Sequence, residues 1–226
     1  EKLDECPTIL TEREIANVLG PSYVAGKFLC RLSGSDTPRE LAFMRIYKQI
    51  PIAGTEYEAP IIRAVQATGR LNIKSWPSKR TAVILSPKLL GYQLGKQGET
   101  DLVPGGYILY LVWEKVPGES LDFHRFWSCP FSERQEFRAK FRRAYETLVR
   151  FGYRPQMPGL PKIIYEWATG EMHISGFRCA VPTDPSQNWN DLIYVQYSLA
   201  LATTAMDKYY PVKSTDLYHD AKGWGW

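Results

Sequence analysis

The stretch Gly152–Ala180 reads GYRPQMPGLPKIIYEWATGEMHISGFRCA and carries the strongest fold signal in the chain. Its first part is rich in Pro and Gly, which predicts a loop. The apolar run Ile163–Tyr165 predicts a short strand, and Thr169-Gly170 predicts a tight turn after it. Residues 172–175 predict a second strand, and a Gly-Phe dipeptide follows. The segment therefore predicts a loop, a strand, a turn and a second strand.

Length and composition indicate an ordinary globular protein. The chain has 226 residues, of which 44% are hydrophobic and 23% charged. This length is sufficient for one large domain, or for two small lobes that share a cleft. The net charge of +4 is mild, and acidic residues are interspersed among the basic ones. A clustered basic face is typical of nucleic-acid binders, so we expect no nucleic-acid partner.

The cysteines and the hydropathy pattern exclude several other classes. Cys6, Cys30, Cys129 and Cys179 lie far apart and form no CxxC pair, so we expect no zinc or redox cofactor. Two disulfides in a secreted protein remain an alternative. No apolar run approaches the ~20 residues of a membrane span. No signal-peptide pattern follows Glu1, although earlier processing would hide one, and we expect a soluble, cytoplasmic protein.

The first half of the chain predicts a β-rich lobe with one main helix. Residues 11–19 begin with a capping box, Thr11 with Glu14, and predict a short helix. Residues 56–71 predict the main helix, with Ile61, Ile62, Ala64 and Val65 facing inward. Strands are predicted at residues 23–32, 41–47, 82–85, 88–92 and 107–113. The last of these, YILYLVW, is continuously apolar and predicts a central strand buried on both faces.

The second half predicts helices. Residues 132–151 form the clearest one, with Ser132 as N-cap and an apolar stripe at three- and four-residue spacing. Six basic residues occupy its remaining positions, and interspersed glutamates favour a solvated face over a nucleic-acid surface. Residues 190–208 predict a second long helix. The apolar stripe comprises Phe137, Phe141, Ala144, Tyr145 and Leu148, and the basic residues are Arg134, Arg138, Lys140, Arg142, Arg143 and Arg150.

This order predicts an α+β protein with three parts. Residues 1–113 form the β-rich half, residues 114–120 (EKVPGES) a hinge, and residues 121–226 the helical half. The three parts are expected to make up one domain, with a cleft between its two lobes.

Four segments of the sequence resemble fungal protein-kinase-like proteins with degenerate catalytic motifs. They are FMRIY at 43–47, VPGGY at 103–107, WEKVPGESL at 113–121 and the stretch Gly152–Ala180. The resemblance covers roughly residues 20–200, and it lacks a Gly-rich GxGxxG between Val24 and Leu32. It implies a kinase-like two-lobe fold, with a small antiparallel β-rich N-lobe and a mostly helical C-lobe. Because only residues 178–226 follow the Gly-Phe dipeptide, that C-lobe would be shortened.

The resemblance also shows which catalytic groups have been replaced. Arg45 stands where a kinase has its phosphate-binding lysine. When HxDxxxxN is laid on the loop, Pro155 takes the His position, Met157 the catalytic Asp and Lys162 the metal-binding Asn.

The motif that follows the strands has changed in the same way. When DFG is laid on this segment, Gly176 takes the Asp position and Phe177 the Phe position. Glu166 and Glu171 lie beyond the strand and at the turn, where neither has the geometry to substitute. Loss of one preorganised electrostatic contact in an active site reduces the stabilisation of the transition state by ~3–4 kcal/mol. We therefore expect no magnesium-dependent phosphotransfer by the usual mechanism.

Three interpretations of the cleft follow. In the first, it binds an apolar small molecule without a cofactor, and possible chemistry is a cyclisation or isomerisation in fungal secondary metabolism. In the second, the chain is a pseudokinase scaffold for a protein partner. In the third, it is a diverged protein or small-molecule kinase whose acids are misaligned here. We favour the first, because the sequence is rich in aromatic residues near the expected cleft, although such residues also form ordinary cores.

Ten residues are candidates for the first interpretation. Lys162 and Arg45 could stabilise an anion or polarise a carbonyl, and His173 could act as an acid–base group. The alternatives are an ion pair of Arg45 with Glu56 or Glu58, and a hydrogen-bonded core histidine at 173. The expected ligand-binding residues are Glu58, Tyr110, Trp113, Glu114, Val116, Ser175 and Phe177, and no metal ligands are expected.

Overall fold

In the computed structural model, the described residues are 1–16, 20–31, 41–69, 87–176, 180–202, 219, 220 and 222–226. The chain divides into two units, Glu1–Lys74 with Lys88–Lys115, and Ser75–Pro87 with Val116–Trp226. The loop predicted at residues 74–79 and the strand predicted at residues 82–85 lie outside the described residues.

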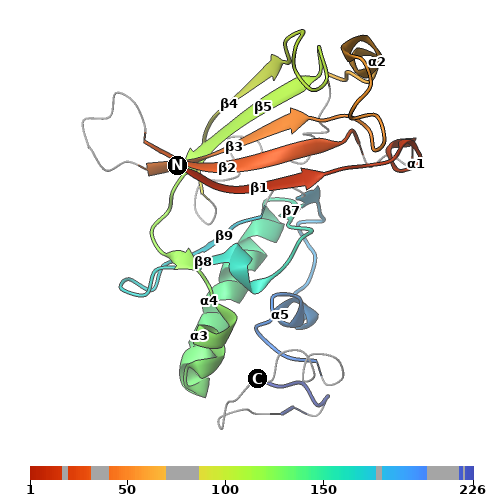
Figure 1. The fold of residues 1–226 in the computed structure, drawn as a ribbon. Coiled ribbons are helices and arrows are strands. Elements are labelled where there is room, and N and C mark those ends of the chain that lie inside the picture. Colours follow the sequence, from red (N-terminus) through yellow and green to blue (C-terminus); the bar gives the residue numbers. More distant parts are fainter. Residues whose placement is uncertain (17–19, 32–40, 70–86, 177–179, 203–218, 221) are drawn as a thin grey trace. The chain divides into compact units, whose positions relative to one another are not determined.

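The first unit is built on a five-stranded antiparallel sheet (Figure 1). The strands lie in the order β1-β2-β3-β5-β4. Their bounds are Lys2–Thr8 for β1, Tyr23–Arg31 for β2, Leu41–Gln49 for β3, Leu89–Lys96 for β4 and Tyr107–Glu114 for β5. The predicted β2 and β3 are confirmed as an antiparallel pair, in which Lys27 lies opposite Arg45. The sequence did not predict β1, because its polar residues lack the alternation of a half-buried strand.

Strand β5 has the predicted position in the sheet but not the predicted burial. It lies between β3 and β4, so its central place is confirmed. Tyr107, Leu109 and Leu111 are buried, whereas Ile108 and Tyr110 are only partly covered. The prediction of burial on both faces is therefore wrong. An antiparallel sheet commonly packs one face and leaves the other partly solvated, even where the strand is apolar throughout.

The helices of the first unit are short. Helix α1 spans Glu12–Glu14, and its capping box is confirmed, since Thr11 N–H donates to Glu14 Oε2 at 2.8 Å and Glu14 N–H to Thr11 Oγ1 at 3.3 Å. Helix α2 spans Pro60–Val65. Its Ile61 and Val65 are 76% and 85% exposed, so the predicted inward face is wrong.

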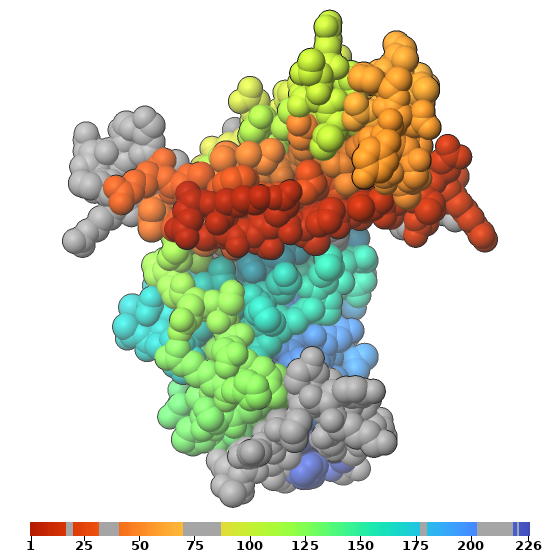
Figure 2. Space-filling model, viewed as in Figure 1, coloured from red at the N-terminus to blue at the C-terminus, as the bar shows by residue number. Residues whose placement is uncertain are grey.

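Polar contacts rather than an apolar face attach α2 to the rest of its unit. The Gln66 side-chain oxygen accepts a hydrogen bond from Ile52 N–H at 3.0 Å, and the Gln66 carbonyl accepts one from Gln49 Nε2 at 2.7 Å. Because these bonds hold the C-terminal end of α2, its apolar side chains can remain in solvent. Figure 2 shows this segment, in orange, at the surface of the first unit.

In its described part, the second unit contains three α-helices, a short 3-10 helix η3 (Leu160–Lys162) and several short strands. Strands β6, β8 and β9 form one sheet and β7 pairs with β10, with every pair antiparallel. The predicted strand, turn and strand after the loop are confirmed as β8 and β9, with Gly170 in the turn at φ 71°. The helices are α3 (Phe123–Ser128), α4 (Phe131–Arg150) and α5 (Leu192–Gln196). The strands are β6 (Glu119–Ser120), β7 (Tyr153–Arg154), β8 (Ile163–Tyr165), β9 (Met172–Ile174) and β10 (Val181–Pro182).

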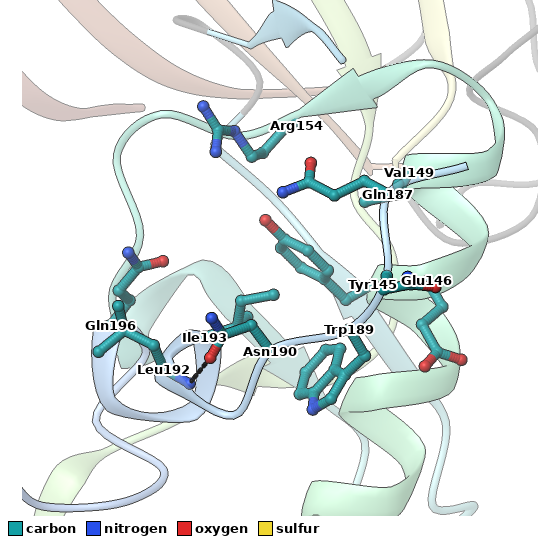
Figure 3. A pocket seen from close by; sticks show the side chains of 11 residues that line it. Tyr145, Glu146, Val149, Arg154, Gln187, Trp189, Asn190, Leu192, Ile193 and Gln196 are labelled. Atoms are coloured by element: carbon teal, nitrogen blue, oxygen red, sulfur yellow. Dashed lines mark hydrogen bonds between the residues drawn. The ribbon is translucent and has the colours of Figure 1, made fainter. Parts of the chain in front are cut away.

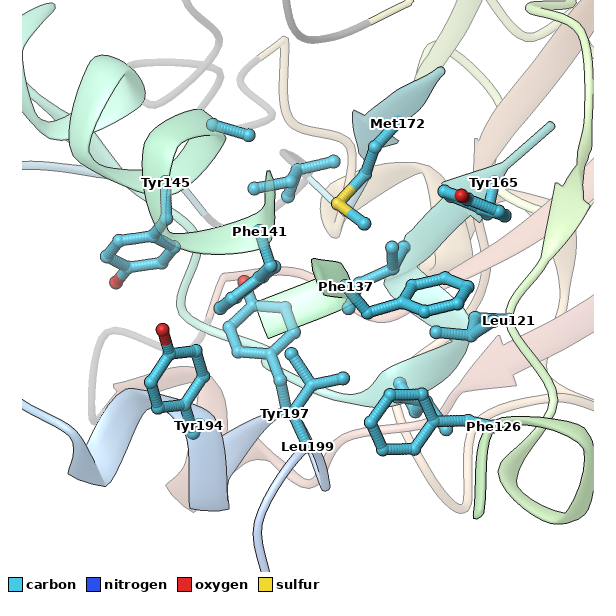
Figure 4. Close-up of a cluster of buried hydrophobic side chains, with 14 of the residues drawn as sticks. Leu121, Phe126, Phe137, Phe141, Tyr145, Tyr165, Met172, Tyr194, Tyr197 and Leu199 are labelled. Carbon is cyan, nitrogen blue, oxygen red and sulfur yellow. The ribbon is translucent and has the colours of Figure 1, made fainter. Parts of the chain in front are cut away.

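The core of the second unit forms around the apolar stripe of α4 (Figure 4). All five predicted stripe residues are buried, which confirms the helical period. Phe137 packs against Tyr165 of β8 with ring centroids 4.2 Å apart, and Phe141 against Tyr197 at 4.7 Å. The helix begins one residue before the predicted cap: Pro130 is the N-cap, so the prediction of Ser132 is wrong.

Two arginines of α4 are buried, contrary to the predicted solvated face. Arg134 and Arg138 are 0% and 2% exposed. Arg134 Nη1 donates to the Cys129 carbonyl at 2.6 Å, and Arg138 Nε donates to the Leu199 carbonyl at 2.7 Å. Both guanidinium groups also lie over aromatic rings, including that of Trp127. Long cationic side chains can be buried where carbonyls and aromatic faces replace water.

The helix predicted at residues 190–208 is much shorter within the described residues. Helix α5 ends at Gln196, and Ser198 has a φ of 56°. The N–H groups of Leu199 and Ala200 both donate to the Tyr194 carbonyl, at 2.8 and 3.3 Å. The left-handed backbone at Ser198 and the two hydrogen bonds to the Tyr194 carbonyl end the helix. Residues 203–208 lie outside the described part.

Two further observations bear on the sequence predictions. Cys6, Cys30 and Cys129 carry free thiols, and Cys179 is outside the described residues. Among the helices described, none combines the length and the hydropathy of a membrane-spanning segment.

Candidate functional site

The predicted site residues of the first unit do not share one surface. Arg45 on β3 and Trp113 on β5 lie together, with the guanidinium carbon 5.9 Å from the Trp113 ring centroid. Tyr110 is three positions from Trp113 on the same strand. Since side chains alternate between faces along a strand, Tyr110 and Trp113 project from opposite faces of the sheet. The two residues therefore cannot line one wall of a pocket.

Arg45 belongs to a small group of cationic and aromatic side chains. Phe43 packs against Trp113, with ring centroids 6.0 Å apart. Lys27 of β2, opposite Arg45 in the ladder, has its Nζ 4.0 Å from the Phe43 ring centroid. The alternative of an Arg45 ion pair with Glu56 or Glu58 is not observed among the described residues.

The remaining predicted residues of the first unit are on its periphery. Glu58 is exposed just before α2, and Glu114 is partly buried at the end of β5. Val116, a buried residue, already belongs to the second unit. Phe177 lies outside the described residues.

In the second unit the structure brings Lys162, Ser175 and Gly176 together. Ser175 donates two hydrogen bonds to the Lys162 carbonyl, from its N–H at 2.7 Å and from its hydroxyl at 3.0 Å. Gly176 has a φ of 92°, and a Cβ built on it would lie 3.2 Å from Lys162 Cδ and 3.4 Å from Lys162 Cγ. The aliphatic stem of Lys162 thus occupies the space into which a side chain at position 176 would project.

His173 lies on β9, opposite Ile164 of β8. Its neighbours Met172 and Ile174 point into the core, so His173 projects from the other face of the strand. Both of its ring nitrogens are buried, and neither has a hydrogen-bond partner in the described part of the chain. The alternative of a hydrogen-bonded core histidine is therefore not observed.

Neither nearby glutamate replaces the missing acids. Glu166 is turned back on its own loop, where its carboxylate accepts a hydrogen bond from Ala168 N–H at 3.1 Å. Glu171 is exposed at the turn. Within the described residues, no group of three or more His, Cys, Asp or Glu side chains is arranged to hold a metal ion.

A pocket of about 160 Å³ lies elsewhere in the second unit (Figure 3). We call it the α4–α5 pocket, since its walls come from the C-terminal half of α4, Arg154 of β7, and the segment that leads into α5. Sequence reasoning missed it, because Tyr145 was assigned to the core and the amide-rich run before α5 carried no known motif. It is lined by Tyr145, Glu146, Val149, Arg154, Gln187, Asn188, Trp189, Asn190, Leu192, Ile193 and Gln196.

The electrostatics of this pocket are set by two residues. Burial raises the pKa of Tyr145, and the nearby Arg154 guanidinium partly opposes that shift. The Tyr145 hydroxyl is therefore protonated at neutral pH and available as a hydrogen-bond donor.

Comparisons with known proteins identify no family for the chain. No family model matches it, and no curated protein matches it. Solved structures give weak similarities. One is the Cydia pomonella granulovirus kinase PK-1, with 12% identity and a TM-score of 0.43, covering 70% of this chain and 48% of that one.

Two further structures are similar at the same level. The bifunctional kinase-methyltransferase WbdD has 13% identity and a TM-score of 0.40, covering 76% of this chain and 32% of that one. A divergent kinase lacking the glycine-rich loop, which regulates membrane ultrastructure of the Toxoplasma parasitophorous vacuole, has 17% identity and a TM-score of 0.37. That match covers 79% of this chain and 56% of the kinase.

The chain thus spans between 32% and 56% of the length of these structures. It has a distant structural similarity to protein-kinase-like folds, in a mixed α+β chain with a five-stranded antiparallel sheet.

Proposed function

We propose that this kinase-like chain does not transfer phosphate with magnesium and acts instead by binding a small molecule. The observation that carries the proposal is the packing of the Lys162 stem against Gly176, with Lys162 Cδ 3.2 Å from the position of a Cβ. These are the positions at which the sequence resemblance puts the two metal-binding residues. An ammonium group and a glycine there leave a divalent cation with repulsion in place of ligands.

The geometry also argues that this state is built into the local fold. A φ of 92° at Gly176 is a conformation that glycine adopts freely and other residues rarely adopt, and an aspartate there would also meet the Lys162 stem. The two bonds from Ser175 to the Lys162 carbonyl fix the backbone on both sides. A side chain at position 176 would therefore meet both an unfavourable backbone conformation and the Lys162 stem.

The proposed ligand is an apolar molecule that carries a carbonyl or an acidic group. Lys162 is partly buried and has no ion pair among the described residues. A cation in such a position can donate a hydrogen bond to a carbonyl oxygen and stabilise negative charge that develops on it. A cofactor-free cyclisation or isomerisation needs little more than this donor and a shaped pocket. Turnover of this type in fungal secondary metabolism belongs to the proposal.

The alternative is a scaffold for a protein partner, and one observation favours it. Tyr57, Ile61 and Val65 are 101%, 76% and 85% exposed around α2, and Ile62 is exposed beside them. Clustered exposed apolar side chains commonly mark protein interfaces. An apolar surface on a partner would cover them.

One set of measurements tests both functions. Native mass spectrometry of the freshly purified chain would detect a small ligand, and we expect Lys162→Met to lose that ligand. Lys96→Met, at an exposed lysine of β4, is the matched control and should keep it. Thermal unfolding with ATP, with and without magnesium, should show no magnesium-dependent stabilisation.

Three outcomes separate the interpretations. A magnesium-dependent rise in melting temperature with ATP would overturn the proposal and favour a diverged kinase. A stoichiometric polypeptide that is lost on Ile61→Glu and retained on Lys162→Met would favour the scaffold. Equal loss of the small ligand in Lys162→Met and Lys96→Met would show that Lys162 does not hold it.

A further inference from the structure

We infer that the α4–α5 pocket is a second binding site, specific for a small organic carboxylate with a single ring. The site shares no residue with the one proposed at Lys162, and every residue that lines it belongs to the second unit. Its size, the direction of its polar groups and its charge each support this ligand class.

The size of the pocket fits one ring. Its volume of about 160 Å³ is close to the roughly 150 Å³ of an engineered apolar cavity that binds benzene. Val149, Leu192 and Ile193 supply aliphatic walls, and Trp189 and Tyr145 supply aromatic ones (Figure 3). The two aromatic rings hold each other in place, with centroids 5.9 Å apart at an interplanar angle of 84°.

The polar groups around these walls present donors. The Asn190 side-chain oxygen already accepts a hydrogen bond from Leu192 N–H at 2.9 Å, and the Gln187 side-chain oxygen accepts one from the Thr183 hydroxyl at 2.9 Å. Because both amide oxygens are engaged, the amide NH₂ groups are the ends left to meet a ligand. A carboxylate is an acceptor without donors, and so it complements such a site.

Tyr145 adds a hydroxyl donor to the pocket. Tyr145 lines the pocket and is 3% exposed as a residue, and its hydroxyl makes no hydrogen bond among the described residues. Figure 3 shows this hydroxyl pointing toward Arg154 and Gln187. A ligand oxygen in the pocket would accept a hydrogen bond from this hydroxyl.

The charge of the pocket selects an anion. The Glu146 carboxylate accepts a hydrogen bond from Arg142 Nε at 2.7 Å, so its charge is compensated. Arg154 has no ion pair within the described part of the chain. Its guanidinium group is therefore the uncompensated charge of the pocket, and planar guanidinium groups bind carboxylates through paired hydrogen bonds.

Benzoate is the probe that tests the site, and benzamide is its neutral counterpart of the same shape. Isothermal titration of the full chain should show saturable binding of benzoate, and binding of benzamide weaker by about tenfold or more, the factor that loss of a charge-assisted hydrogen bond produces. Arg154→Gln should weaken benzoate binding by a similar factor. Tyr145→Phe should weaken it several-fold and leave benzamide less affected.

Arg143→Gln is the matched control, because Arg143 is an exposed arginine of α4 that does not line the pocket. It should bind benzoate as the parent chain does, and circular dichroism should show that all variants are folded. The inference is overturned if benzoate does not bind saturably, if benzamide binds equally well, or if Arg143→Gln lowers the affinity as much as Arg154→Gln. Lys162→Met should leave benzoate binding unchanged, so this test and that of the proposed function fail independently.

Discussion

At the scale of single residues, Gly176 is the position at which the proposed loss of a metal site can be tested. Replacement by aspartate would restore the acid but place a non-glycine residue at φ 92° with its Cβ 3.2 Å from Lys162 Cδ. We expect Gly176→Asp to lower the free energy of unfolding by about 1–3 kcal/mol. Urea denaturation measures this change, and isothermal titration should show no gain of magnesium-ATP binding.

The control separates backbone strain from side-chain crowding. Lys162→Ala combined with Gly176→Asp removes the crowding but keeps the strain, so the double variant should recover only part of the lost stability. If Gly176→Asp unfolds at the same urea midpoint as the parent chain, the proposed incompatibility between an acid and this backbone is wrong.

At the scale of elements, α4 connects segments that are distant in sequence through its buried arginines. Arg138 donates from Nε to the Leu199 carbonyl at 2.7 Å and from Nη1 to Gln135 Oε1 at 3.0 Å. Its guanidinium carbon lies 5.3 Å from the Trp226 ring centroid. Burial, and then the nearby Arg134, lower its pKa to about 9. The side chain is therefore still cationic at neutral pH.

This arrangement gives a prediction for Arg138. Arg138→Met keeps much of the packing but leaves the Leu199 carbonyl without its donor, and we expect it to cost about 1–3 kcal/mol. Arg138→Ala adds a cavity and should cost more, about 3–5 kcal/mol. Arg143→Met, at an exposed arginine of the same helix, should change stability by less than about 0.5 kcal/mol. Equal unfolding free energies for the Met and Ala variants would contradict a packing role for the Arg138 stem.

At the scale of the whole molecule, the sequence pattern predicts where helices and strands lie better than it predicts which of their side chains are buried. Runs of apolar, β-branched and aromatic residues located β2, β3 and β5, and the helical stripe located α4. The same pattern put Arg138 in solvent, because a sequence does not show that carbonyls and rings from distant segments will surround a cation. It also put Ile61 in a core, because the polar bonds of Gln66 that hold α2 leave no periodic signal.

The candidate sites show the same difference between local and distant signals in the sequence. Lys162 and Gly176 were found by alignment to a local motif, and the structure places them in contact. The α4–α5 pocket was not found, because Tyr145, Arg154 and Gln187 meet only through the fold. Aromatic character alone suggests a shared surface for Tyr110 and Trp113, but their odd spacing on one strand places them on opposite faces of the sheet.

The tyrosines of both units predict how stability changes at alkaline pH. Burial raises the pKa of Tyr194 to about 12 and shifts the pKa values of Tyr107, Tyr145 and Tyr197 in the same direction. The folded state therefore retains protons that the unfolded state loses above the ordinary tyrosine pKa of about 10. Stability contributed by these groups is complete below pH about 10 and is lost as the pH rises toward 12.

Arg138 has the opposite effect over an overlapping range. Its pKa is lower in the folded state, so the cost of burying its charge is complete below pH about 9 and is relieved as the pH rises. The destabilisation from four tyrosines at alkaline pH should exceed the stabilisation from one arginine. We therefore expect the urea midpoint to fall steadily above pH about 10. Tyrosinate absorbance, followed in the same titration, should rise together with unfolding. A midpoint that stays constant or rises over this range would show that the four hydroxyls are not buried as the structure has them.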